Sequence, residues 1–347
     1  MYYQTKNPHG GDIYAEPVEL DYSANTNPLG TPPAVIAAAA AALERADRYP
    51  DPYCRALVKA ISEAEGVKPE HVLCGNGASE LIFTFCAAAK AKKAAALAPT
   101  FSEYASALAL FGGETVLYPL RPERDFLPDE GLLDWLRAEK PEAIFLCNPN
   151  NPTGRLFPHD LIMDVITLCK QTNARLFVDE CFLELARGGE SLKGLLEDFP
   201  GLFLLRAFTK SYGMAGLRLG YCFSADRSLL ARMAELTPPW DVSAPAQAAG
   251  VAALGEGEFL RRAKELIDRE RPRLRAALEA MGLRVCPSDV NYLLFRGPVS
   301  LLADMRLRGI ALRDCANFPG LGPGWYRIAV RREEENDRLL AALKECL

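Results

Sequence analysis

The segment around Lys210 carries the most specific chemistry in the sequence. This lysine lies in an apolar, glycine-rich run, RAFTKSYGMAGLRLGY, and Arg218 follows it eight residues later. An exposed lysine is protonated near neutral pH, but burial beside a cation lowers the pKa of its amine. A lysine of that kind can form a Schiff base with a carbonyl compound. We therefore interpret Lys210 as a candidate nucleophile.

A second candidate is the glycine-rich loop at residues 75–80, GNGASE, between the apolar run HVLC and the helical stretch LIFTFCAAA. Glycine lets the backbone approach a ligand, and a helix N-terminus offers free N–H groups, so this loop could bind a phosphate. Taken alone, it is equally well explained as a tight strand-to-helix turn. A dinucleotide fingerprint requires glycine where Glu80 stands, and the sequence contains no GxxxxGK[ST] motif.

Two further polar segments also follow apolar runs. NPNNPTG, at residues 148–154, comes after AIFLC, and Asp179-Glu180 comes after RLFV. Each by itself is explained by a turn or by an acid at a strand end. Because there is no phosphate-binding lysine loop, we do not expect Asp179 to hold the metal ion of an ATPase.

The elements that must position these four segments form an alternating pattern. Between residues 70 and 225, segments of helical length separate six β-rich runs: HVLC, AAALA, ETVLY, AIFLC, RLFVD and LFLLR. This pattern predicts an α/β fold with a mostly parallel sheet and helices on both faces. The carboxyl ends of parallel strands share one edge of a sheet, so we expect the four segments to converge there.

Helices flank this region, and the regular alternation of predicted strands and helices ends after about residue 240. Thr31 is a candidate N-cap for the helix VIAAAAAALERA, and a second helix covers residues 53–65 and stops at Gly66. A charged helix at residues 256–281, strands near RVC, NYLLF and WYRIAV, and a closing helix predict a smaller α+β domain. The expected divisions are an N-terminal segment at 1–35, which packs on the small domain and the active site, a large cofactor-binding domain at 36–240 and a small domain at 241–347.

Composition excludes several classes of protein. The 347 residues are 49% apolar and 24% charged, which is ordinary for a soluble globular chain. A net charge of -5 offers no basic field for nucleic acid or an anionic membrane. No signal-peptide pattern and no long apolar run occur, so we expect a cytoplasmic protein. The 10 Cys and 3 His lack metal-ligand spacing, and we expect neither a metal site nor a disulfide framework.

Taken together, GNGASE, NNPTG, VDE and TKSYGMAGLRLGY resemble, in order and spacing, the aspartate-aminotransferase superfamily of pyridoxal-phosphate enzymes, fold type I. The resemblance covers nearly the whole chain and implies pyridoxal 5'-phosphate as the cofactor, held covalently by Lys210. Asp179 would pair with the pyridine nitrogen and keep it protonated. The remaining cofactor contacts implied are Asn151 on the ring hydroxyl, Phe101 stacked on the pyridine, and Thr209, Arg218 and the backbone of Gly77, Ala78 and Ser79 on the phosphate.

The two ends of the chain resemble most closely the threonine-phosphate decarboxylases of cobalamin biosynthesis, and next the histidinol-phosphate aminotransferases. HGG at residues 9–11, DYSANTNPLG and LRDCANFPG carry this likeness. Arg327 matches the superfamily's carboxylate-binding arginine, whose fork suits a planar bidentate partner. The other substrate-binding residues implied are His9, Gly10, Asn25, Asn151 and Arg313, of which Arg313 helps to receive a substrate phosphate.

Two positions depart from the superfamily pattern. Ala207 stands three residues before the lysine, where a serine or threonine commonly binds the cofactor phosphate. Phe182 stands three residues after Asp179, where many aminotransferases place a tyrosine against the ring oxygen. The first removes one expected hydroxyl contact, and the second favours decarboxylation.

The resemblance implies decarboxylation of O-phospho-L-threonine, a small phosphorylated amino acid, to (R)-1-aminopropan-2-ol O-phosphate. Histidinol-phosphate aminotransferase is the main alternative, because it uses the same parts to break the Cα–H bond. A nicotinamide-dependent oxidoreductase is disfavoured by Glu80 and the lysine motif. A noncatalytic regulator of this fold would be expected to carry a DNA-binding domain, for which we expect no room.

Residues 48–51, RYPD, resemble a superfamily segment whose tyrosine reaches the cofactor phosphate of the other subunit. The resemblance therefore implies a homodimer with shared active sites, in which Tyr49 binds cofactor. From the residues alone, the alternative is a turn between helices with a core tyrosine.

Overall fold

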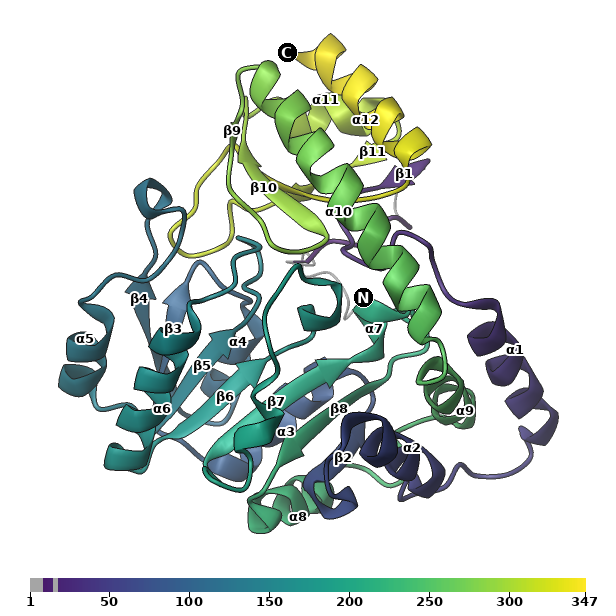
Figure 1. Cartoon of the computed structure of the whole chain (residues 1–347), viewed down its shortest axis with the longest axis vertical. Helices are drawn as coiled ribbons and strands as arrows, with labels where there is room; N and C mark the ends of the chain where they lie inside the picture. The colour runs from purple at the N-terminus through teal and green to yellow at the C-terminus, as the bar shows by residue number, and fades with distance from the viewer. Residues whose placement is uncertain (1–8, 15–17) are drawn as a thin grey trace.

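The computed structural model of this protein describes residues 9–14 and 18–347. Its larger part is built on a seven-stranded sheet with the order β2-β8-β7-β6-β5-β3-β4 (Figure 1). The strands are β2 (Val72–Gly75), β3 (Lys93–Ala98), β4 (Glu114–Pro119), β5 (Ala143–Cys147), β6 (Arg175–Asp179), β7 (Leu202–Ala207) and β8 (Gly220–Ser224). Strand β8 runs antiparallel to both its neighbours, and the other neighbouring pairs are parallel. All six predicted strands are confirmed, and β8 was not expected.

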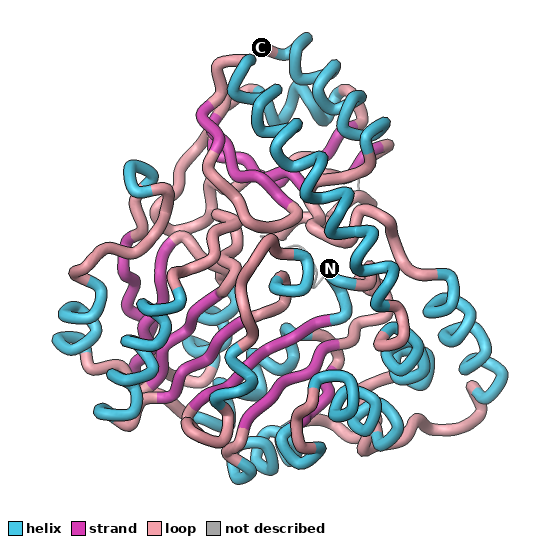
Figure 2. The backbone as a smooth tube through the Cα atoms, in the orientation of Figure 1, coloured by secondary structure: helices cyan, strands magenta, loops and turns pink. Residues whose placement is uncertain are grey.

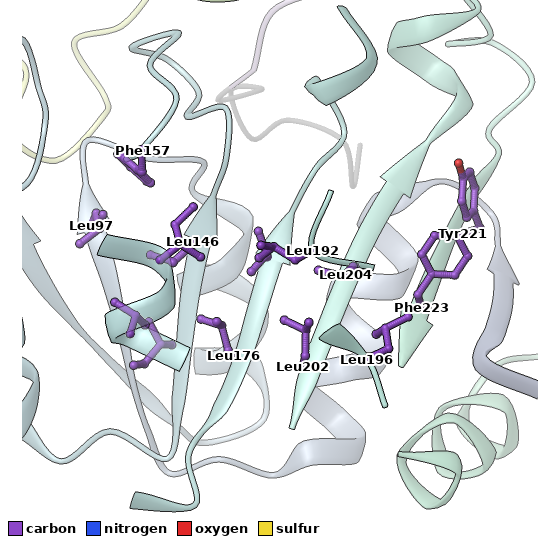
Figure 3. Packing of buried hydrophobic residues seen from close by; sticks show 14 of the residues in the cluster. Leu97, Leu146, Phe157, Leu176, Leu192, Leu196, Leu202, Leu204, Tyr221 and Phe223 are labelled. Atoms are coloured by element: carbon purple, nitrogen blue, oxygen red, sulfur yellow. The ribbon is translucent and has the colours of Figure 1, made fainter. Parts of the chain in front are cut away.

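Side chains alternate between the two faces of this sheet. On β5, Ile144 and Leu146 join the core on one face, whereas Phe145 joins the core on the other. Figure 3 shows the first face, where Leu146, Leu176 and Leu204 lie in one layer. Helices α5 (Leu132–Glu139) and α6 (His159–Thr172) contribute to that core, and the other face is covered by α3 (Ala78–Ala89), α4 (Glu103–Leu110) and α8 (Arg227–Leu236). Burial on both faces explains why these strands read as continuous apolar runs.

Three helices lie beside the β2 edge of the sheet. They are α1 (Pro33–Ala42), α2 (Arg55–Glu65) and α9 (Ala244–Ala253), and α9 packs against the other two (Figure 1). Helix α2 ends at Gly66 in the left-handed conformation, as predicted. The predicted N-cap of α1 is wrong: Pro32 occupies that position, and the Thr31 hydroxyl donates instead to the Gly213 carbonyl at 2.9 Å.

A second, antiparallel sheet lies above the first in the order β12-β13-β10-β9 (Figure 2). Its strands are β9 (Arg284–Val285), β10 (Tyr292–Arg296), β12 (Arg313–Asp314) and β13 (Trp325–Ala329), and its helices are α10 (Gly257–Ala280), α11 (Leu301–Leu307) and α12 (Glu333–Cys346). This confirms the expected mixture of strands and helices. Strand β1 (Leu20–Asp21) pairs in parallel with β11 (Ile310–Ala311), so the N-terminal segment joins this part of the molecule. The exact domain boundaries stay a prediction.

Over residues 9–14 and 18–347, no helix combines the length and the apolar character that crossing a membrane requires.

Candidate active site

The four chemical segments meet in one cavity of about 380 Å³ between the large sheet and the N- and C-terminal parts of the chain. The predicted site residues that line it are His9, Gly10, Asn25, Ala78, Ser79, Phe101, Asn151, Asp179, Thr209, Lys210, Arg218, Arg313 and Arg327. The predicted convergence at the carboxyl ends of the parallel strands is therefore confirmed. Gly77 and Tyr49 are not among the residues that line this cavity.

Lys210 lies on the short helix α7 (Phe208–Ser211), which follows β7 directly. Its ammonium nitrogen is 5.5 Å from the centre of the Phe182 ring. Burial, together with the positive charge of Arg327, lowers the pKa of Lys210 from 10.5 to about 8. At neutral pH the neutral, nucleophilic amine is then about one molecule in ten, far more than for an exposed lysine. The environment thus suits covalent attachment of a carbonyl compound.

Asp179 ends β6 and is 6% exposed, with both carboxylate oxygens held. The Tyr104 hydroxyl donates to Oδ2 at 2.7 Å, and the Cys181 amide donates to Oδ1 at 2.9 Å. Burial and the nearby Asp179 charge raise the pKa of Tyr104 well above its usual value, so its hydroxyl remains a donor. These contacts fix the carboxylate where it can pair with a pyridinium nitrogen.

The start of α3 presents hydrogen-bond donors to the cavity. Gly77 has φ +86, a backbone conformation that favours glycine, and a Cβ there would lie 2.7 Å from the Arg218 guanidinium, which would have to move. The first helical residues, Ala78 and Ser79, face the same cavity as Thr209. Free N–H groups at a helix N-terminus, a guanidinium and hydroxyls are the donors that a phosphate takes. Ala207 also lines the cavity and, as expected, offers no hydroxyl.

Arg327 lies on β13 and lines the cavity. Its guanidinium donates to the side-chain oxygen of Asn151 and, at 2.9 Å, to the Ser23 carbonyl. Its Nε atom is buried and has no hydrogen-bond partner in the described part of the chain. A buried donor of this kind costs free energy unless a ligand engages it. The site therefore fits an anionic ligand group beside Asn151.

The N-terminal segment closes one side of the cavity. A Cβ on Gly10 would lie 2.4 Å from the Ser23 carbonyl oxygen, so glycine permits a close approach of two strands of chain. Asn25 is 1% exposed, and within residues 9–14 and 18–347 neither its amide oxygen nor its nitrogen has a partner. Arg313 donates to Asn317 at 2.8 Å and lies over the Phe318 ring. Asn25 and Arg313 are thus placed to meet a ligand.

Phe101 and Tyr49 have different surroundings. Phe101 lines the cavity, with its ring centre 5.5 Å from that of His9. Tyr49 is 79% exposed and stacks on Trp240, with ring centres 4.5 Å apart. The alternative of a core tyrosine at position 49 is therefore wrong, and its cofactor role stays a prediction because it requires a second subunit.

Sequence reasoning missed residues that act through others. Glu103 and Tyr104 follow Phe101 at the start of α4 and were not singled out, although polar side chains shortly after a strand are a usable signal. Cys181 contacts Asp179 through its backbone, which no side-chain motif reveals. Burial and the Asp179 charge raise the pKa of the Cys181 thiol well above its usual value, so it is not a second nucleophile.

Glu80 gives a prediction for stability. Its carboxylate accepts from the Asn76 amide at 2.6 Å, whereas burial, a side-chain hydrogen bond with Asp241 and the charge of Asp241 raise its pKa from 4.5 to about 7. A raised carboxyl pKa stabilises the fold at low pH, and this contribution is lost between about pH 4.5 and 7. Asp241→Asn should therefore raise the melting temperature by a few °C at pH 8 and change it little at pH 4.

Thermal melts across this pH range test the prediction, with the exposed Asp47→Asn as the matched control. The same gain at pH 4 and pH 8 would contradict the assignment of the effect to ionised Glu80.

Comparison with known proteins shows which family this chain belongs to. Residues 18–343 match the aminotransferase class I and II family. The chain is 36% identical to a threonine-phosphate decarboxylase from Salmonella typhimurium over 94% of this chain and 91% of the relative. It is 34% identical to a histidinol-phosphate aminotransferase from Desulfitobacterium hafniense, over 95% and 92% of the two chains.

Comparison with solved structures supports the same family assignment. A histidinol-phosphate aminotransferase from Sinorhizobium meliloti, determined in complex with pyridoxal-5'-phosphate, matches with a TM-score of 0.82 and 26% identity. The match covers 94% of this chain and 90% of that structure. The fold type I architecture expected from the sequence is confirmed. This chain therefore belongs to the aminotransferase class I and II family of pyridoxal-phosphate enzymes.

Proposed function

We propose that this protein is a pyridoxal-phosphate-dependent carboxy-lyase that converts O-phospho-L-threonine to (R)-1-aminopropan-2-ol O-phosphate and CO2, a reaction of cobalamin biosynthesis. One observation carries the proposal: Arg313 and Arg327 are paired residues on neighbouring strands, and both line the cavity. Side chains of directly paired residues share one face of a sheet. Two cations side by side suit a substrate with two anionic groups, a carboxylate and a phosphate.

The residues that hold the cofactor follow from the family and from the fit of the site. Lys210 holds it covalently, Asp179 pairs with its ring nitrogen, and Arg218, Thr209 and the start of α3 bind its phosphate. When bound, pyridoxal phosphate supplies an electron sink for the electron pair released at the substrate's Cα. Asn151 and Phe101 complete the walls around the ring.

The chain's own residues then decide which bond breaks. Arg327 binds the substrate carboxylate and Arg313 the phosphate, so the substrate is held at both ends and its orientation about Cα is set. The Cα–carboxylate bond breaks, CO2 leaves, and Cα gains a proton. Lys210 is the proton donor, because a pKa of about 8 leaves it mostly protonated at neutral pH yet able to release the proton.

Product analysis tests this proposal against its alternative. The holoenzyme is given O-phospho-L-threonine alone or histidinol phosphate with 2-oxoglutarate, and kcat/KM is measured for each. We expect aminopropanol phosphate from the first and at least a hundredfold lower kcat/KM with the second. Formation of glutamate at the higher rate would replace decarboxylation with transamination.

We also propose that the protein is a homodimer. Five exposed large apolar side chains belong to α1, to α9, which packs against α1, and to the segment between α1 and α2: Ile36, Leu43, Tyr49, Tyr53 and Val251. Exposed apolar side chains on neighbouring elements are typical of a protein-protein interface. The proposed role of Tyr49, a contact with the cofactor phosphate of the other subunit, explains why an aromatic residue is exposed here.

Tyr49→Phe should keep the dimer and weaken cofactor binding about tenfold, because one hydrogen bond to a phosphate is lost. Light scattering at micromolar concentration gives the oligomeric state, and fluorescence titration gives the cofactor affinity. Tyr14→Phe, which removes a hydroxyl from an exposed tyrosine that does not line the cavity, is the matched control and should leave the cofactor affinity unchanged. A fully active monomer would contradict the dimer proposal.

Finally, we propose a cytoplasmic location. All ten cysteines are free thiols, and nine of them are buried. Free thiols are typical of a reducing compartment.

A further inference from the structure

Tyr292 is a buried aromatic residue that contacts two residues of the cavity wall. It begins β10, is fully buried, and is not among the residues that line the cavity. Burial raises the pKa of its hydroxyl well above the usual value, so the hydroxyl stays protonated and remains a donor. The proposed mechanism gives this residue no role, although its neighbours Arg327 and Phe182 both line the cavity.

The register of the second sheet explains how Tyr292 reaches Arg327. Leu294 is paired with Arg327, and Tyr292 is paired with Ala329, so Tyr292 is the diagonal neighbour of Arg327. Diagonal neighbours share one face of a sheet and are within reach of aromatic and long side chains. The guanidinium carbon of Arg327 accordingly lies 5.4 Å from the centre of the Tyr292 ring. This cation–π contact is strengthened because both side chains are buried.

Tyr292 is anchored to the larger part of the molecule. Its hydroxyl donates to the Asn150 carbonyl at 2.8 Å. The Asn150 side chain is itself held, because its oxygen accepts from Thr100 at 2.8 Å and its nitrogen donates to the Pro99 carbonyl at 2.9 Å. The Tyr292 ring also meets the Phe182 ring edge to face, with ring centres 5.0 Å apart. Contacts outside its own sheet therefore hold the ring in place.

Arg327 is in turn held by groups that leave one of its donors for a ligand. Its two terminal nitrogens donate to the side-chain oxygen of Asn151 and to the Ser23 carbonyl. Among residues 9–14 and 18–347, its buried Nε has no hydrogen-bond partner. With the Tyr292 ring beside it, the guanidinium is ordered before a ligand binds, which lowers the entropic cost of binding a carboxylate.

We propose that Tyr292 is a positioning residue: it holds Arg327 so that the site prefers a ligand with a carboxylate to the same ligand without one. The inference rests on the proposed function, in which Arg327 binds the substrate carboxylate and the product has lost that group. Substrate is then retained by Arg327 until CO2 leaves, whereas the product keeps only its phosphate as an anionic group and dissociates more readily. Tyr292 acts through Arg327 and is not itself a catalytic residue.

Two unreactive ligands test this preference. 3-Phosphoglycerate carries a carboxylate and a phosphate at the spacing found in O-phospho-L-threonine, whereas glycerol 3-phosphate has a hydroxymethyl group in place of the carboxylate. Neither has an amine, so the holoenzyme turns over neither. Calorimetry should show tighter binding of 3-phosphoglycerate by the wild type. Tyr292→Leu, which removes the ring, should reduce that preference about tenfold and leave the affinity for glycerol 3-phosphate unchanged.

Two further variants separate positioning from general stability. Tyr292→Phe keeps the ring and loses the bond to Asn150, so we expect a lower melting temperature and a preference close to that of the wild type. Tyr326→Leu is the matched control, because Tyr326 is a buried tyrosine on β13 whose hydroxyl also donates to a carbonyl, that of Pro298 at 2.9 Å. Its side chain lies on the opposite face of the sheet from that of Arg327. It should lower the melting temperature and leave the preference unchanged.

The outcomes separate this inference from the proposed reaction. An unchanged preference in a Tyr292→Leu protein that still releases CO2 would overturn the inference alone. The expected pattern in an enzyme that releases no CO2 would instead reject the proposed reaction and support the role of Tyr292. Equal losses of preference in Tyr292→Leu and Tyr326→Leu would reduce Tyr292 to a structural residue. A wild type that shows no preference for 3-phosphoglycerate would also overturn the inference.

Discussion

Lys210→Ala should lower turnover of O-phospho-L-threonine by several powers of ten and abolish the visible absorbance of the lysine-bound cofactor. In the proposed function two roles are lost together, because Lys210 would both hold the cofactor covalently and supply the proton to Cα. Burial lowers the pKa of Lys210 to about 8, which makes its amine suitable for covalent attachment and for proton transfer. Steady-state kinetics and an absorption spectrum of the purified protein measure the two effects.

Lys170→Ala provides the matched control, because Lys170 is an exposed lysine near the end of α6, outside the cavity. Its spectrum and turnover should equal those of the wild type. A Lys210→Ala protein with near-normal activity would contradict the assignment of the site and of the cofactor together.

Arg313→Ala should weaken binding of O-phospho-L-threonine by roughly ten- to a hundredfold and leave binding of L-threonine nearly unchanged. A charge-assisted hydrogen bond contributes about 1.5 to 3 kcal/mol, and only the phosphorylated compound makes it. Arg313 is 7% exposed, so the charge acts in a site where water screens it little. Inhibition constants of the two amino acids give the comparison.

Arg313→Lys is the informative second variant, because it keeps the charge and loses the guanidinium fork. We expect an affinity for O-phospho-L-threonine between those of the wild type and Arg313→Ala. An equal loss for threonine and its phosphate would mean that Arg313 only supports the β12-β13 pair and that the phosphate binds elsewhere.

Much of the fold could be predicted from the sequence because its patterns are local. The apolar runs of the central strands are buried on both faces, which makes them continuous and easy to read. Gly66 could be predicted as the end of its helix, because helices commonly end at a glycine in the left-handed conformation. Strand β8 was missed because Gly220–Ser224 continues the lysine motif, and because its antiparallel pairing with β7 and with distant β2 is set only by folding.

The residues that line the site were predictable where they lie in local motifs, and less so where a side chain is held by a residue distant in sequence. Lys210, Asp179 and Arg218 lie in motifs at strand ends, which placed them correctly in one cavity. Thr31 was misassigned as a cap because the carbonyl that it meets, that of Gly213, is distant in sequence. Glu103 and Tyr104 could not be recognised for a related reason, since their partners His9 and Asp179 are brought to them only by folding.

The most direct test of the central claim is the fate of the substrate carboxyl carbon. The holoenzyme is incubated with O-phospho-L-threonine labelled at that carbon, in the presence of 2-oxoglutarate, and trapped CO2 is counted against the amine product. Our account predicts one labelled CO2 for each aminopropanol phosphate formed, with no glutamate. Label that remains in a phosphorylated 2-oxo acid, with glutamate formed in equal amount, would contradict it.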